Sequence, residues 1–407
     1  MTWRPQLTLK LADLDATEVA VGAATVSRGR ETPFEQPRAG YARLQLLDPP
    51  IVPSLLDRVQ LLAEVDSVQV PLWSGEVSDV EVEVIGYGQH GDTFVANVTA
   101  VGPLARVHRG MVRDGGYPQQ LDGERVAEVL LDAVAARYAT VSGTRRFVDT
   151  SPDRRYSDSD LVDLDQVDAG LWTVQADLAG DDPWRIVQQA ANDGGGAVYE
   201  TRDGLIGYAD ADRRLADAAD GYLQLPDAAV LPLGLRSAVA FGEVANTVEL
   251  TYSTGTVVGI NDEGVRRFGA ILTERVSTRL LDEAAAQQRA ELIAAFRSSD
   301  ARRLDRVVLD LASADLDEQV RAELLTIDPG RPVRLIALPA AIAPSTWSGF
   351  VEAVELTADR FGVQLALTVS PFELSALGGR WASMPEALTW QGADPTVTWN
   401  TAEELLT

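Results

Sequence analysis

Val59-Gln-Leu-Leu-Ala63 and Trp73-Ser-Gly75 decide the fold, because both segments recur further along the chain as Val333-Arg-Leu-Ile-Ala337 and Trp347-Ser-Gly349. The two copies are 274 positions apart and align without a gap over 28 positions, 57–84 and 331–358. Nine of these positions are identical, where unrelated sequences would share about two. The chain therefore contains an internal repeat.

Each copy has the period of two that is typical of β-strands. In both copies the Trp-Ser-Gly step precedes an alternating run, and a third strand follows, Thr93–Val101 in the first copy and Val363–Val369 in the second. An earlier strand also corresponds, Ala42–Leu46 with Arg306–Asp310. The pattern predicts an α+β, mainly β chain, in which two tube-like β-barrel domains flank an inserted α/β region.

The repeated motif consists of Trp73, Ser74, Gly75, Trp347, Ser348 and Gly349. An aromatic residue at a fixed position in a strand is typical of a barrel core, so we expect both tryptophans to pack inside. The glycines permit a bend or a bulge between strands. Alternatively, exposed tryptophans on β-barrels bind sugars, which would make this chain a carbohydrate-binding module.

Composition shifts divide the chain into four expected parts: 1–110, the first barrel; 111–240, the α/β insertion; 241–377, the second barrel with a long internal helix; and 378–407, a C-terminal docking tail. In the insertion, Asp182-Pro-Trp184 predicts a helix start, and Asp203-Gly204 predicts the turn of a hairpin. In the second barrel, Asp282 caps a helix expected over 284–296.

The charge and composition narrow the classes of function. The 407 residues carry a formal charge of −26 and contain no cysteine, which disfavours phosphate-gripping nucleic-acid binders, disulfides and thiol catalysis. The N-terminal segment is polar, and no segment has the length and apolarity of a membrane span. We expect a protein that folds in a cytoplasm.

No pattern of residues indicates catalysis, a metal site or a bound cofactor. The only histidines, His90 and His108, lie far from any nucleophile turn. The acidic run of 158–168 lacks the glycine and the bidentate glutamate of a calcium loop, and a solvated loop is the favoured interpretation. We therefore predict a protein that is not an enzyme and has no cofactor or metal.

The order of the parts resembles the tail hub proteins of bacteriophages, also called baseplate hub or minor tail proteins. Four short motifs carry this resemblance: Val244–Val248, Phe268-Gly269, Leu281–Ala285 and Ile327–Gly330. It implies a homotrimer in which two barrels per chain form a pseudo-sixfold ring at the tail tip of the virion, after assembly in the host cytoplasm. The implied partners are a tail tube or distal tail ring, other tip or fibre proteins, and DNA or tape measure protein in transit.

Longer members of that family carry lysozyme or peptidase extensions, and the short segment after residue 377 does not imply one. A peptidoglycan hydrolase of the tail tip is the remaining alternative. Trp381, Trp390 and Trp399 recur every nine residues in 378–407, a segment too short to bury them, so we expect this tail to dock onto another chain. We also expect an acidic channel lining, because like charge keeps DNA from adhering.

Overall fold

The computed structural model describes residues 6–11, 18–32, 35–86, 93–108, 110, 115–142, 162–177, 182–238, 244–298, 303–339, 346–359 and 362–371. In chain order, its main elements are β1 (Gln6–Leu11), β2 (Glu18–Gly29), β3 (Tyr41–Leu47), β4 (Arg58–Val65), β5 (Val68–Gly86), β6 (Thr93–Val101), α1 (Leu104–Val107), β7 (Gln120–Leu121), α2 (Asp122–Ser142), β8 (Val162–Val167), β9 (Thr173–Val174), α3 (Pro183–Gly194), β10 (Ala197–Glu200), β11 (Ile206–Ala209), α4 (Ala211–Ala219), β12 (Leu223–Gln224), β13 (Val230–Ala238), β14 (Thr247–Tyr252), β15 (Gly255–Ile260), α5 (Asp262–Phe268), β16 (Thr273–Ser277), α6 (Glu283–Arg297), β17 (Arg303–Asp310), α7 (Glu318–Leu325), β18 (Pro332–Ile336), β19 (Thr346–Asp359) and β20 (Val363–Pro371).

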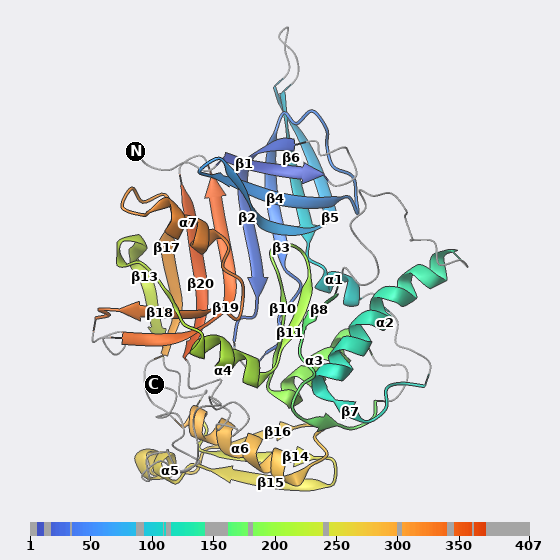
Figure 1. Ribbon diagram of the computed structural model, residues 1–407, viewed down its shortest axis with the longest axis vertical. Coiled ribbons are helices and arrows are strands. Elements are labelled where there is room, and N and C mark those ends of the chain that lie inside the picture. Colours follow the sequence, from blue (N-terminus) through green and yellow to red (C-terminus); the bar gives the residue numbers. More distant parts are fainter. Residues whose placement is uncertain are drawn as a thin grey trace.

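The chain is mainly β, and one 12-stranded sheet dominates it (Figure 1). The first six strands pair in a closed circuit, β1-β4-β5-β6-β3-β2 and back to β1. The second set, β18-β19-β20-β17-β13 with β12 beside β18, has two ends, β12 and β13, that do not pair with each other. Strands β2 and β19 pair antiparallel, and this pairing joins the two sets into one sheet.

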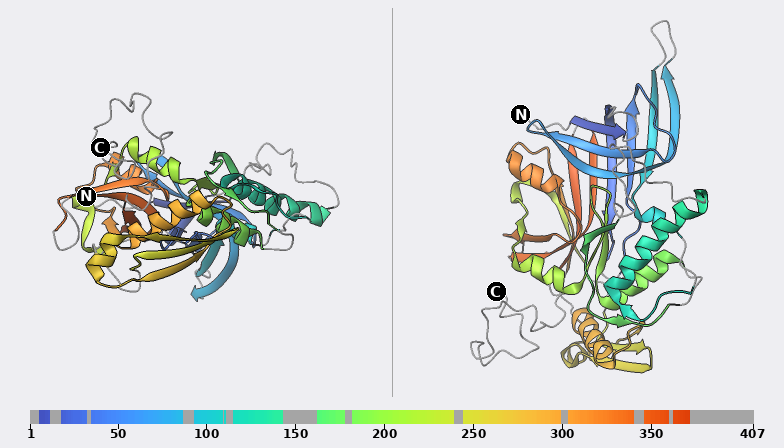
Figure 2. Two further views of the ribbon diagram at one scale, coloured as in Figure 1. Left: turned by 90° about the horizontal axis from the view of Figure 1, so that it is seen from below. Right: turned by 45° about the vertical axis from the view of Figure 1, so that its right-hand side comes forward.

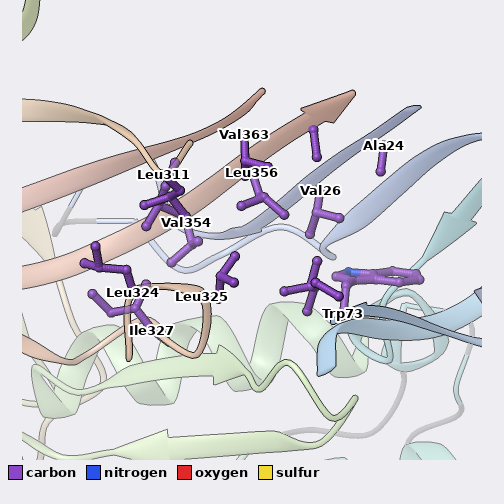
Figure 3. Packing of buried hydrophobic residues seen from close by; sticks show 14 of the residues in the cluster. Ala24, Val26, Trp73, Leu311, Leu324, Leu325, Ile327, Val354, Leu356 and Val363 are labelled. Atoms are coloured by element: carbon purple, nitrogen blue, oxygen red, sulfur yellow. The ribbon is translucent and has the colours of Figure 1, made fainter. Parts of the chain in front are cut away.

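A single hydrophobic core extends over both sets of strands. Ala24 and Val26 of β2 pack beside Val354 and Leu356 of β19, and Trp73 lies at one end of the same cluster (Figure 3). Alternate residues of each strand point into this cluster, as the period of two predicts. Separating the two sets would expose apolar surface at the joint to water, and each Å² exposed would cost about 25 cal/mol of free energy.

The strands of the two copies correspond in register as well as in order. Strand β4 pairs with β5, and β18 with β19, at equivalent positions. The alignment of β3 with β17, however, needs a correction by one residue. Arg43 pairs with Thr99, and Arg306 pairs with Thr368. The two threonines are equivalent, because Thr99 pairs with Asp79 of β5 and Thr368 pairs with Ala353 of β19, the position that corresponds to Asp79. The counterpart of Arg306 is therefore Arg43 and not Ala42.

The insertion forms its own layer beside the sheet (Figures 1 and 2). Helices α2 and α3 pack on each other and on β10 and β11, around buried Trp184, Val187 and Tyr208. Helix α3 begins as predicted, because the Asp182 carboxylate accepts a hydrogen bond from the Trp184 N–H at 2.9 Å. The β10–β11 hairpin turns at Gly204, which has a positive φ of 83°.

The long helix, α6, does not pack on the second set of strands. Helix α6 covers the three-stranded sheet β15-β14-β16 with a separate core that includes Val248, Leu250 and Ala290. Strands β12 and β13, which precede residue 240, pair instead with β18 and β17. The period of a strand shows that one face is buried but not which element covers it. The pattern within 241–377 therefore predicts one barrel, where the structure has a separate three-stranded sheet.

Candidate assembly site

The Trp-Ser-Gly motif occupies the same structural position in both copies. Gly75 lies opposite Val59, and Gly349 lies opposite Val333. Residues two apart in a strand share a face, so each indole ring lies over its own glycine. A Cβ atom on Gly75 would come within 2.7 Å of Cζ2 of Trp73, and the corresponding distance from Gly349 to Trp347 is also 2.7 Å. Each glycine therefore makes room for an aromatic ring.

Both tryptophans belong to the core. Trp73 is 1% exposed and Trp347 is 7% exposed. A sugar-binding tryptophan presents its ring face to the ligand, and neither of these rings is presented to solvent. The burial of both rings agrees with the expected packing of Trp73 and Trp347 in the core.

The copies also share an irregularity of the backbone. A register shift follows Val77 in β5, and another follows Val351 in β19, at equivalent positions. The Val77 N–H donates to the Asp57 carbonyl at 2.9 Å, and the Val351 N–H donates to the Arg331 carbonyl at 3.0 Å. Bulges increase local twist, so both copies bend at the same point.

At the joint between the sets, the bulge residue of β19 is a buried carboxylate. Glu352 is 3% exposed and accepts hydrogen bonds from Arg30 and Arg214, each at 2.6 Å, and from the Ser370 hydroxyl. Burial by itself raises the pKa of Glu352, but the Arg214 and Arg30 guanidinium groups lower it to about 2. The ion pairs tie the end of β2 and helix α4 to β19. Ser78 stands at the equivalent position in the first copy.

A second ionic contact links the joint to the insertion. Asp328 accepts from the Arg28 guanidinium of β2. Its other oxygen accepts from Arg202 of the β10–β11 hairpin at 2.7 Å. Asp328 belongs to the Ile327–Gly330 motif, so that motif holds three parts of the chain together.

Glu200 fixes the insertion to the first set. Its carboxylate, 2% exposed, accepts from the Gly40 N–H at 2.6 Å and from the Leu104 N–H at 2.8 Å. Burial raises the pKa of Glu200 to about 7, although both N–H groups oppose that shift. Glu200 therefore satisfies two backbone donors at the start of β3 and of α1.

The acidic run of 158–168 is described only in part. Asp168 accepts from the Asp210 N–H at 2.9 Å and lies 3.5 Å from Arg213, so its carboxylate is used inside the insertion. Among the described residues, no group of histidine, cysteine or acidic side chains is arranged to hold a metal ion. Within the same residues, no helix is both long and apolar enough to cross a membrane.

The predicted docking residues Trp381, Trp390 and Trp399 lie outside the described residues. Sequence reasoning missed the joint of β2 with β19 and its carboxylate, Glu352. A signal was present, because the alternating core pattern of β19 is interrupted by a charged residue where the first copy has serine.

The fold of this chain is similar to that of solved phage tail proteins. No family model and no curated protein matches the sequence. A solved structure of a 43 kDa tail protein of prophage MuSo2 from Shewanella oneidensis is 11% identical, with a TM-score of 0.58 over 91% of this chain and 99% of that one. A tail protein from Neisseria meningitidis is 10% identical, with a TM-score of 0.60 over 92% of this chain and 99% of that one. The chain therefore shares its fold with phage tail proteins.

Proposed function

We propose that this chain is a structural tail-tip hub of a tailed bacteriophage, built as a homotrimer. The observation that carries this proposal is the duplicated strand unit, in which β4-β5 and β18-β19 have one register and one bulge. Two similar units per chain give six units in a trimer, and this number matches a hexameric tube.

In this proposal both units are tube-like barrels. The first set already pairs in a closed circuit. The second set ends in β12 and β13, which only 225–229 separate along the chain, so its two edges are held near each other. Leu225 and Ala229 of this short connection are buried in the shared core, which is consistent with a nearly closed second barrel.

The trimer would continue the tail tube or a distal tail ring and would connect it to tip and fibre proteins. Assembly would take place in the host cytoplasm, and DNA or tape measure protein would pass through the channel at ejection. Three chains carry three times the formal charge of −26, so we propose a predominantly acidic lumen. Acidic walls keep DNA mobile, whereas an arginine lining would hold its phosphates.

The mass of the purified chain in solution tests the assembly. Light scattering after size-exclusion chromatography should give the mass of three chains, and electron microscopy should show a ring with six similar lobes. A stable monomer at high concentration, or a hexamer of chains, would contradict the proposal. The acidic lumen is tested separately by mapping charge on that ring.

We propose a structural role rather than peptidoglycan hydrolysis, the alternative from another class. The buried carboxylates of Glu200 and Glu352 bond to backbone donors and arginines of the fold, and such groups are not free to protonate a glycosidic oxygen. Incubation of the full chain with purified peptidoglycan checks this. Release of soluble fragments would favour the hydrolase.

A further inference from the structure

The two copies differ at one strand edge. In β19, the segment Ala353–Asp359 pairs with β20 on one side and with β2 on the other. The equivalent segment of β5, Asp79–Ile85, pairs with β6 on one side. Among the described residues, no strand pairs with its other side, because β4 reaches only as far as Glu76. An unpaired strand edge is a template for another strand.

The side chains of this edge support the comparison. Val82 is 49% exposed and Val84 is 45% exposed, whereas their counterparts in β19, Leu356 and Ala358, are 4% and 1% exposed. Ile85 is 58% exposed. In β19 these positions lie where β2 pairs alongside. The equivalent positions of β5 are also apolar, but no described strand pairs with them on that side.

The repeat also identifies the element that would supply the cover. Strand β13 corresponds to β2, because each pairs antiparallel with the counterpart strand of its own set, β17 and β3. The register of β13 follows from residues that lie side by side across neighbouring strands. In the first copy this row is Ala24, Leu44, Val98 and Val80. In the second copy the row that ends at Val354, the counterpart of Val80, is Leu235, Val307, Leu367 and Val354. Leu235 therefore corresponds to Ala24, and Arg236 corresponds to Thr25. In the described part of the chain, β13 pairs only with β17.

We propose that β13 of one copy pairs antiparallel with the Asp79–Ile85 edge of β5 in the next copy, in the register that joins β2 to β19. Inside the chain, Thr357 pairs with Thr25 and Ala358 pairs with Ala24. The same register between copies places Glu83 opposite Arg236 and Val84 opposite Leu235. This inference rests on the ring of copies proposed above and specifies its contact.

The charges agree with this register and oppose the simplest competitor. The Arg236 side chain is 71% exposed, with an ion pair to Asp305 at 3.3 Å, and opposite charges facing each other across strands are favourable. Asp79, Glu81 and Glu83 alternate along β5 on one face. Two β5 edges paired with each other would bring these carboxylates together, and like charges in that position are destabilising. The β5 edge therefore selects a basic partner over itself.

The location of the two edges determines the kind of assembly. Strand β13 lies on one side of the molecule and β5 on the other (Figure 1). Different surfaces that meet between copies form a head-to-tail contact, which closes into a ring or extends as a filament. A ring of three copies would use every such edge once.

A cross-link tests the register, since the chain contains no cysteine. The double variant Glu83→Cys/Arg236→Cys, oxidised as the full-length protein, should give disulfide-linked chains up to three on a non-reducing gel. The matched control is Thr25→Cys/Thr357→Cys, the same register inside one chain, which should form a disulfide with no change in mass. A mixture of the two single variants should give linked dimers only.

The outcomes separate this inference from the proposed function. If the chain has the mass of a trimer and the control forms its disulfide but the double variant does not, the register is wrong while the ring stands. A monomer without cross-links overturns both. Cross-linking of Glu83→Cys alone would show that β5 edges meet each other. As a second readout, Glu83→Arg and Arg236→Glu should each weaken assembly several-fold, and the combination should restore it.

Discussion

Substitution of Gly75 by alanine is the most direct test of the repeated Trp-Ser-Gly motif. The added methyl group would lie 2.7 Å from Cζ2 of Trp73, and closer still to Cη2 of the ring and to the carbonyl oxygen of Val101. Carbon atoms in contact normally lie about 3.5–4.0 Å apart, so the ring or the strand has to move by more than about 1 Å to relieve the closest contact. Trp73 is 1% exposed and lies in the hydrophobic cluster, so the ring can move only against other buried side chains.

The expected loss of stability follows from the two groups that the methyl group would meet, the Trp73 ring and the Val101 carbonyl. Overpacking of a well-packed interior costs about 1–3 kcal/mol, and a backbone carbonyl cannot rotate away as a side chain can. We expect Gly75→Ala to lower the free energy of unfolding by about 3 kcal/mol, the upper end of that range. Gly349→Ala should cost about the same, because Trp347 and the Ser370 carbonyl surround that glycine in the same way.

Urea denaturation followed by circular dichroism measures the effect. A loss of about 3 kcal/mol would shift the midpoint by roughly 1 M for an m-value of about 3 kcal/mol per M. Gly86→Ala is the matched control in the same strand, because its methyl group would meet nothing closer than 3.9 Å. Equal midpoints for Gly75→Ala and Gly86→Ala would refute the packing argument. A cost at only one of Gly75 and Gly349 would refute the equivalence of the copies.

Three further predictions concern the joint, the insertion and the tail. Glu352→Gln leaves two buried guanidinium groups without their counterion and should lower the free energy of unfolding in urea by about 3–5 kcal/mol. The control, Glu355→Gln, breaks an exposed ion pair with Arg306 and should lower it by less than about 1 kcal/mol. Similar losses for the two variants would contradict the role of the buried ion pairs. The raised pKa of Glu200 means that its protonated form stabilises the fold below the unfolded pKa, and that this contribution is lost as the pH rises through about 7. The stability difference between wild type and Glu200→Gln should therefore shrink from about pH 5 to about pH 8, and a difference that grows would be inconsistent with this assignment. Deletion of 378–407 should leave unfolding unchanged and impair tip assembly, and normal tips from the truncated chain would count against a docking role.

The repeat could be predicted from the sequence because strand register is a local property. Identical spacing from Val59 to Gly75 and from Val333 to Gly349 fixes which residues share a face, and strands that slip by one residue bury the wrong face. The helix expected over 284–296 lies at Glu283–Arg297, since Asp282 caps it through the Ala284 N–H at 2.8 Å.

The contacts between distant segments could not be predicted in this way. Strands β2 and β19 both alternate correctly, but alternation does not say which strand lies beside which. The covering of β14–β16 by α6 is hidden for the same reason, because a small apolar core of alanines can face either a sheet of its own or a neighbouring barrel. The one-residue slip at Arg43 arose where the two copies differ in loop length, since the period of two then no longer fixes the alignment.

The pairing of β2 with β19 has a consequence for synthesis on the ribosome. Ala23 of β2 pairs with Asp359, which is translated more than 300 residues later. At about 5–20 residues per second, the outer edge of β2 waits roughly 20 s to one minute for its partner. During that time Ala24 and Val26, buried in the finished protein, lie on an open strand edge, which is the kind of surface through which nascent chains aggregate. The first six strands can close their own circuit early, so the β2 edge is the segment of the nascent chain that a chaperone would most usefully cover.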